Sequence, residues 1–103
     1  MAVYLVTSCD ITDPEKYAPY VPNVLPLLEK YGAEVIAADK NAITIDSEER
    51  DLTVILKFPS PEDAEKLAED PEYKPWLDIR LASTTNRTTI IVGEFDPSGN
   101  TPP

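Results

Sequence analysis

The chain has 103 residues, enough for one domain with a modest core, and its longest apolar runs are too short to span a bilayer. Nine Lys and Arg against 19 Asp and Glu leave a net charge of −10, which disfavours binding to nucleic acid or to an anionic membrane surface. The absence of histidine removes the commonest general base and nearly every zinc site, so we predict no metal and no other cofactor. The single cysteine, Cys9, excludes an internal disulfide and is compatible with a reducing cytoplasm, where we expect the protein.

The N-terminal stretch 3–10, VYLVTSCD, predicts the first strand. It has no basic flank, which argues against a signal peptide. Thr12 or Asp13 caps the helix that follows, and Pro14 suits the first helical position.

Apolar residues then recur every three or four positions from Tyr17 to Tyr31, which predicts one helical stripe. Three prolines interrupt this stripe, at positions 19, 22 and 26. Because each proline removes a backbone donor, the helix either begins late and bends or restarts near Asn23. Gly32 is the expected cap at its C-terminal end.

The middle of the chain predicts further strands and a second helical region. Residues 34–39 and 42–46 are two short apolar runs, which indicate a hairpin or one bulged strand. Residues 51–58 predict a strand that Pro59 ends, and Ser60 caps the next helix.

A further helix restarts at 70–72, and residues 88–95 predict the closing strand. The order of these elements predicts an α+β, ferredoxin-like βαββαβ fold: a four-stranded antiparallel sheet with helices on one face. We expect a single domain over residues 1–95 and a flexible C-terminal tail over 96–103, which is rich in Pro, Gly and Ser.

Too many strand positions are apolar on both faces for one side of the sheet to face water. We expect the side without helices to draw on Leu52, Val54, Leu56 and either Ile90 or Ile91. A large exposed apolar face favours association, so the predicted partner is a second copy packed sheet against sheet in a homodimer.

Arg80 is the main candidate for a functional residue. On a helix it shares a face with Tyr73, Trp76 and Leu77, so the aromatic residues would shape an apolar pocket. The guanidinium would bind a carboxylate or an enolate-like oxygen. The alternative is structural: Arg80 caps the helix end or pairs with an acid at position 70, 72 or 78.

Tyr17 and Tyr20 are candidates for a proton donor, or for a hydrogen bond to a substrate oxygen, if a nearby cation lowers the pKa of either phenol. The alternative is that both rings belong to the core. Ser83 and the hydroxyl residues after it line the mouth of the pocket or form a plain turn.

The sequence resembles the family called domain of unknown function 1330, within the dimeric α+β barrel superfamily. The resemblance runs from about Val3 to Phe95 and rests on the order and spacing of Tyr4, Asp13-Pro14-Glu15, Tyr17, Tyr20, Tyr31-Gly32, Glu49-Arg50, Phe58-Pro59-Ser60, Asp70-Pro71-Glu72-Tyr73, Arg80, Ser83 and Arg87. It implies a homodimer with a cleft between each sheet and its helices, and pocket residues Tyr17, Tyr20, Tyr73, Arg80 and Ser83. Ala33 departs from the family pattern, which usually repeats glycine there.

Related barrels include cofactor-free oxygenases, lactone isomerases and dehydratases, so fold alone does not identify a reaction. The leading hypothesis is a dimer that binds a small apolar or aromatic acid and catalyses a cofactor-independent isomerisation, dehydration or oxygenation. Arg80 would hold the anion and a tyrosine would handle the proton. The alternative is a non-catalytic ligand-binding or interaction module.

Overall fold

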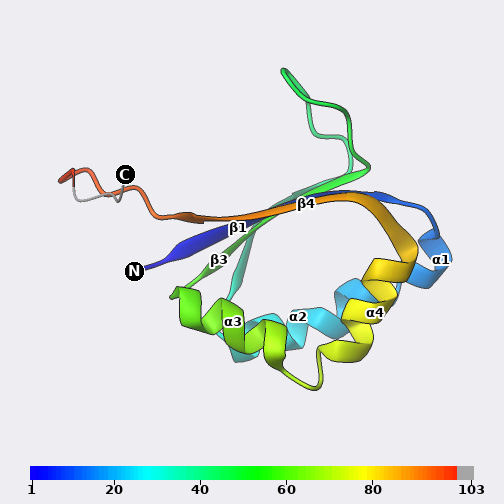
Figure 1. Ribbon diagram of the computed structural model, residues 1–103, viewed down its shortest axis with the longest axis horizontal. Coiled ribbons are helices and arrows are strands. Elements are labelled where there is room, and N and C mark those ends of the chain that lie inside the picture. The colour runs from blue at the N-terminus through cyan, green and yellow to red at the C-terminus, as the bar shows by residue number, and fades with distance from the viewer. Residues whose placement is uncertain (100–103) are drawn as a thin grey trace.

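In the computed structural model, which describes residues 1–99, one antiparallel sheet carries four helices on a single side (Figure 1). This is the predicted ferredoxin-like α+β fold. The sheet has the strand order β2-β3-β1-β4. In chain order the elements are β1 (Val3–Ile11), α1 (Pro14–Tyr17), α2 (Tyr20–Lys30), β2 (Glu34–Asp39), β3 (Leu52–Phe58), α3 (Pro61–Glu69), α4 (Lys74–Ser83) and β4 (Thr84–Gly93). Residues 100–103 of the predicted tail lie outside the described residues.

The prolines divide the first helical stripe into two helices. The Asp13 side chain caps α1 by accepting the Lys16 N–H, and α1 ends after four residues. Helix α2 restarts at Tyr20, so that Pro22 falls in its first turn, where backbone donors have no partner within the helix. At the other end Gly32 has a φ of 72°, and the Ala33 N–H donates to the Leu28 carbonyl at 2.9 Å. This confirms the predicted glycine cap.

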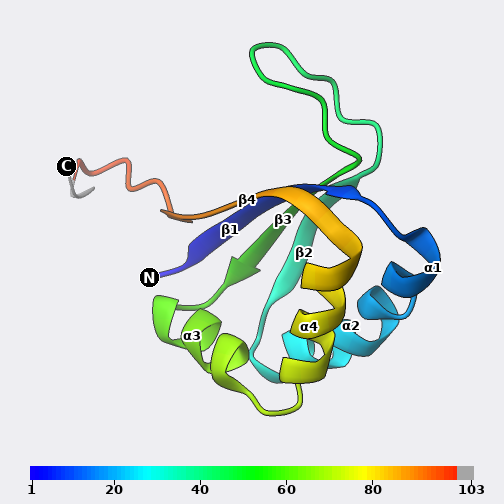
Figure 2. The ribbon, with the colours of Figure 1, turned by 45° about the vertical axis from the view of Figure 1, so that its right-hand side comes forward.

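Two strand predictions need correction. Residues 42–46 form no strand but belong to a loop over residues 40–51, which projects from the sheet on the side away from the helices (Figures 1 and 2). The closing strand begins at Thr84, directly after α4, and not at Thr88. Thr84 and Thr85 pair with the end of β1, so the hydroxyl-rich stretch that could have been a turn is strand.

The core lies between the helices and the inward side of the sheet. In the register of the central strands, Val3 faces Phe58, Leu5 faces Leu56 and Cys9 faces Leu52. Phe58 has no exposed surface and packs with apolar residues of the strands and helices, namely Val3, Val24, Leu27, Leu28, Ala64 and Leu67.

This register corrects the predicted assignment of faces. Leu52, Val54 and Leu56 line the helix-covered side, since they pair with the residues of β1 that point inward. Ile91 also pairs with an inward residue, Leu5, whereas Ile90 pairs with Val6 and points to the uncovered side, as one of the two predicted options had it.

Candidate functional site

A large cleft lies between the helix-covered side of the sheet and the four helices. Helix α4 lies against both α1 and α2 (Figure 2), which closes one side of this space. Its volume is about 1010 Å³, at the upper end of the roughly 300–1,000 Å³ typical of small-molecule sites. The walls are mainly apolar and include Leu5, Leu52, Val54, Leu56 and Phe58 from the strands and Val21, Val24, Leu25, Leu28 and Leu77 from the helices.

Arg80 brings a positive charge to this apolar wall from the last turn of α4. Its Nη2 donates to Thr7 Oγ1 at 3.1 Å and to Thr89 Oγ1 at 3.5 Å, and the two threonine hydroxyls lie 2.8 Å apart. Within residues 1–99, Arg80 forms no ion pair with a carboxylate. A guanidinium carries five N–H donors, so neutral hydroxyls leave most of its donors and its whole charge for a ligand.

The acids proposed as partners for Arg80 are engaged elsewhere or form no ion pair. Asp70 pairs with Lys30 at 3.0 Å and Asp78 pairs with Lys74 at 2.7 Å. Glu72 forms no ion pair among the described residues. The structural alternative, in which Arg80 pairs with one of these carboxylates, is therefore not what the structure shows.

Three tyrosines from different elements also line the cleft. The Tyr17 and Tyr20 rings stack with centroids 5.4 Å apart, and the Tyr73 ring meets Tyr20 edge-on at 6.4 Å. The hydroxyls of Tyr20 and Tyr73 are hydrogen-bonded at 2.8 Å. Because two hydroxyls share one proton in this bond, the pair retains one O–H to donate to a ligand.

The proton-donor role suggested for Tyr17 and Tyr20 required a nearby cation to lower the pKa of either phenol, but both pKa values are raised. Burial raises the pKa of Tyr20 well above its ordinary value, and the neighbouring Tyr73 raises it further. Burial also raises the pKa of Tyr17. The charge of Arg80 lowers both values but does not outweigh these effects. Tyr17 and Tyr20 are therefore neutral hydrogen-bond donors near pH 7, and neither is a phenolate base.

Two predicted pocket residues lie outside the cleft wall. Trp76 is half-buried and packs against the hydrophobic core. Ser83 is fully buried, and its Oγ donates to the Ile79 carbonyl at 2.6 Å. The Ser83 carbonyl accepts the Thr12 and Asp13 N–H groups, which ties the end of α4 to the start of α1. The structure gives both side chains packing or capping contacts and does not bring them to Arg80.

Three residues that the sequence analysis did not select contribute to the cleft. Thr7 and Thr89 position Arg80, and Cys9 lines the same wall, where burial raises the pKa of its thiol. The sequence pattern could have identified Thr7, because alternation places it on the same face of β1 as Leu5 and Cys9. A hydroxyl on such an apolar face needs a hydrogen-bond partner.

No group of three or more His, Cys, Asp or Glu residues within residues 1–99 is arranged to hold a metal ion. In the same residues, every helix is too short or too polar to cross a membrane.

Solved structures of other proteins share this fold. A protein of unknown function from Rhodopseudomonas palustris is 19% identical, with a TM-score of 0.79 over 93% of this chain and 84% of that one. A dimeric ferredoxin-like protein of unknown function from Jannaschia is 10% identical, with a TM-score of 0.74 over 91% and 100%. SnoaB, a cofactor-independent oxygenase from Streptomyces nogalater, is 8% identical, with a TM-score of 0.67 over 95% and 97%.

At these identities the likeness shows the fold and no activity. No curated protein matches the chain. The model of the family described as "Domain of unknown function (DUF1330)" matches residues 2–95, which is most of the chain. The protein therefore belongs to the DUF1330 family.

Proposed function

We propose that the cleft binds a small apolar or aromatic acid and that Arg80 holds its anionic oxygen. The observation that carries this proposal is the state of Arg80: a half-buried guanidinium on an apolar wall whose contacts within residues 1–99 are two neutral threonine hydroxyls. A half-buried cation without an ion-pair partner strongly favours binding of a ligand that carries a negative charge.

The other walls define the rest of the ligand. Leu5, Val54 and Leu56 offer apolar surface, and the Tyr17 ring offers a flat face. The hydroxyl pair of Tyr20 and Tyr73 has one O–H for an oxygen of the ligand. A compact molecule with an apolar or aromatic body and a carboxylate or enolate oxygen matches these features.

The reaction class we propose is a cofactor-independent isomerisation, dehydration or oxygenation. In each, a base removes a proton beside a carbonyl and negative charge develops on oxygen. Asp51 is the carboxylate on the cleft wall that would accept this proton, and an oxygenation would also consume dioxygen as its oxidant. Arg80 and the tyrosine hydroxyls would stabilise that charge, which is the usual role of donors aimed at a developing oxyanion. The tyrosines act here as hydrogen-bond donors, because the raised pKa values of Tyr17 and Tyr20 are unsuited to a base.

We also propose that the protein is a homodimer whose sheets face each other. Ile90 and Val92 are 59% and 45% exposed on the side of the sheet without helices. The Jannaschia protein, which has the same fold, is described as dimeric. Burial of such a face against a second copy would remove its apolar surface from water.

The test is a thermal-shift titration with aromatic carboxylates, with benzoate and phenylacetate as the probes. Wild type is expected to gain several degrees in Tm, Arg80→Lys to gain less, and Arg80→Ala to gain nothing. The matched control is Arg87→Ala, which removes an arginine of β4 that does not line the cleft and should keep the full ligand-induced shift. An equal shift in wild type and Arg80→Ala would refute the anchoring role of Arg80.

A non-catalytic binding module is the second candidate. The raised pKa values of Tyr17, Tyr20 and Cys9 favour it, since they leave these cleft groups protonated near pH 7. Proton NMR in D₂O separates the two functions for any stabilising acid that has a hydrogen on the carbon beside its carbonyl, as phenylacetate has and benzoate has not. A catalyst should speed the loss of the signal from the hydrogen beside the carbonyl. With a binding module, this signal should disappear no faster than it does without protein.

A further inference from the structure

The loop between β2 and β3, residues 40–51, carries apolar side chains that nothing in residues 1–99 covers. Ile43 is 92% exposed and Ile45 is 91% exposed. The loop has neither helix nor strand and extends away from the helices, beyond the uncovered side of the sheet (Figures 1 and 2). Two almost fully exposed isoleucines on a projecting segment indicate a surface that another molecule covers.

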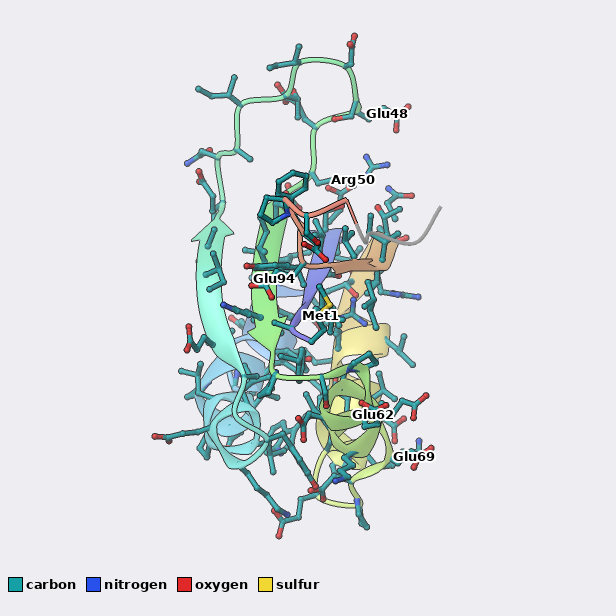
Figure 3. The ribbon with its side chains drawn as sticks, turned by 90° about the vertical axis from the view of Figure 1, so that its left-hand side faces the viewer. Met1, Glu48, Arg50, Glu62, Glu69 and Glu94 are labelled. Carbon is teal, nitrogen blue, oxygen red and sulfur yellow. The ribbon has the colours of Figure 1, made fainter. Side chains whose placement is uncertain are left out.

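The root of this loop is held in place by reciprocal hydrogen bonds. Asp10 Oδ1 accepts the Asp51 N–H at 3.0 Å, and Asp51 Oδ2 accepts the Ile11 N–H at 2.8 Å. Arg50 lies 3.8 Å from Asp10 Oδ2 and donates to Glu48 Oε2 at 3.2 Å; Arg50 and Glu48 are labelled on the loop in Figure 3. The end of the loop that enters β3 is therefore fixed to the end of β1, which holds the loop in a defined direction for contact with a partner.

The loop and the sheet form two walls of one groove. Ala42, Thr44, Ser47 and Glu48 of the loop face Val6, Ser8, Thr88 and Ile90 of the sheet across a space of about 250 Å³, to which Arg50 and Thr53 also contribute. The groove opens onto the apolar uncovered side of the sheet, so one partner seated on this side would contact both walls.

The charge distribution favours a second copy of this chain as that partner. The chain carries a net charge of −10, yet across the centre of the uncovered side, from Tyr4 to Ser8 and their neighbours in β3 and β4, the only charged residue is Lys57. Lys57 lies 3.9 Å from Glu94, which offsets its charge. Glu34 and Asp39 of the edge strand β2 lie on the same side but outside this centre, since they pair with Lys57 and Thr53. Glu48 and Arg50 line the groove. A centre with so little charge on a strongly acidic chain favours contact between two copies, because charged residues are depleted at the cores of interfaces.

We propose that the 40–51 loop of each copy packs against the other copy, with Ile43 and Ile45 as the apolar contacts. In a two-fold dimer the same chain supplies both the loop and the receiving surface, so each interface contains two such loops. This inference rests on the proposed homodimer and adds a second contact to it, beyond the stacking of the two sheets.

The experiment is sedimentation equilibrium over a dilution series of three full-length proteins. Ile43→Ser/Ile45→Ser should weaken dimerisation roughly 100-fold or more, since four isoleucines lose apolar burial in each dimer. Asp46→Ser/Glu49→Ser removes two exposed polar side chains from the same loop that do not line the groove, and should dimerise at least as tightly as wild type. Circular dichroism checks that each variant is folded, as expected for substitutions of exposed residues.

The outcomes separate this inference from the homodimer itself. Wild type that stays monomeric at millimolar concentration overturns both. A dimeric wild type with an unchanged dissociation constant in Ile43→Ser/Ile45→Ser overturns the role of the loop and leaves the sheet-mediated dimer standing. Equal weakening in the isoleucine and acidic variants also overturns it, because the effect would then not depend on the apolar side chains.

Discussion

Asp70 and Arg80, two of the charged residues in the stretch 70–80, have surroundings that differ sharply. The carboxylate of Asp70, 4% exposed, accepts hydrogen bonds from the Tyr31 hydroxyl, from Lys30 Nζ at 3.0 Å and from the Glu72 N–H at 2.8 Å. Arg80 lies at the end of the next helix, α4. Among the described residues, its side chain hydrogen-bonds only to neutral hydroxyls. The first charge is fully satisfied within the fold and joins α2 to the turn before α4. The second is incompletely satisfied, as expected of a group that completes its contacts with a ligand.

The largest effect on stability is expected at Asp70. Asp70→Asn keeps the shape of the side chain but removes the charge that Lys30 and Tyr31 contact, and it places an amide where acceptors are needed. We expect its fall in Tm to exceed that of Tyr17→Phe, Tyr20→Phe or Arg80→Gln in the cleft. The matched control is Asp78→Asn, which removes an exposed acid paired with Lys74 and should melt close to wild type. Equal melting of the two variants would contradict the structural role of Asp70.

The contribution of Asp70 to stability should also depend on pH. Hydrogen bonds from Tyr31, the Glu72 N–H and Lys30 lower the pKa of Asp70 to about 2, from an ordinary value of 3.8. A lowered pKa in the folded state means that the contribution of Asp70 is complete above the unfolded-state pKa and is lost as the pH falls towards 2. The difference in Tm between wild type and Asp70→Asn should therefore be constant above pH 5 and shrink between pH 4 and pH 2. A difference that stays constant down to pH 2 would contradict this assignment.

Capping and turn chemistry made several elements predictable, and tertiary contacts explain the errors. Asp13, Ser60 and Gly32 cap or end helices through local bonds, so their roles are visible in the sequence. Residues 42–46 have a strand-like pattern, but no neighbouring strand pairs with them. Strand propensity without a partner gives no hydrogen-bonded ladder, and these residues remain a loop.

The faces of β3 and α4 depended on packing that a pattern does not determine. Leu56 and Ile55 are both apolar, so alternation shows that they point to opposite sides but not which side the helices cover. The spacing placed Tyr73, Trp76 and Arg80 on one helical face; Tyr73 and Arg80 line the cleft, whereas Trp76 only packs against the core. The direction of the pKa shift at Tyr20 follows from burial in the folded chain, which residue type alone does not reveal.

A moderate effect is expected at the tyrosine pair. Tyr20→Phe removes one side of the 2.8 Å hydroxyl bond with Tyr73 inside the cleft and should lower the free energy of unfolding by about 1 kcal/mol. Tyr17→Phe serves as the control, because Tyr17 stacks on Tyr20 but its hydroxyl forms no hydrogen bond with another described residue. Urea unfolding measures both. A larger loss in Tyr17→Phe than in Tyr20→Phe would show that the Tyr20–Tyr73 bond contributes little.

The smallest effect on stability is expected at Arg80, and it completes the contrast with Asp70. Arg80→Gln loses the 3.1 Å bond to Thr7, but it also removes a half-buried cation that has no ion-pair partner within residues 1–99. These terms oppose each other, so the free energy of unfolding should change by no more than about 0.5 kcal/mol in urea, while aromatic carboxylates cease to stabilise the protein. A residue whose substitution hardly changes the free energy of unfolding but abolishes ligand binding has a functional role. A loss above about 2 kcal/mol would instead make Arg80 a structural residue like Asp70.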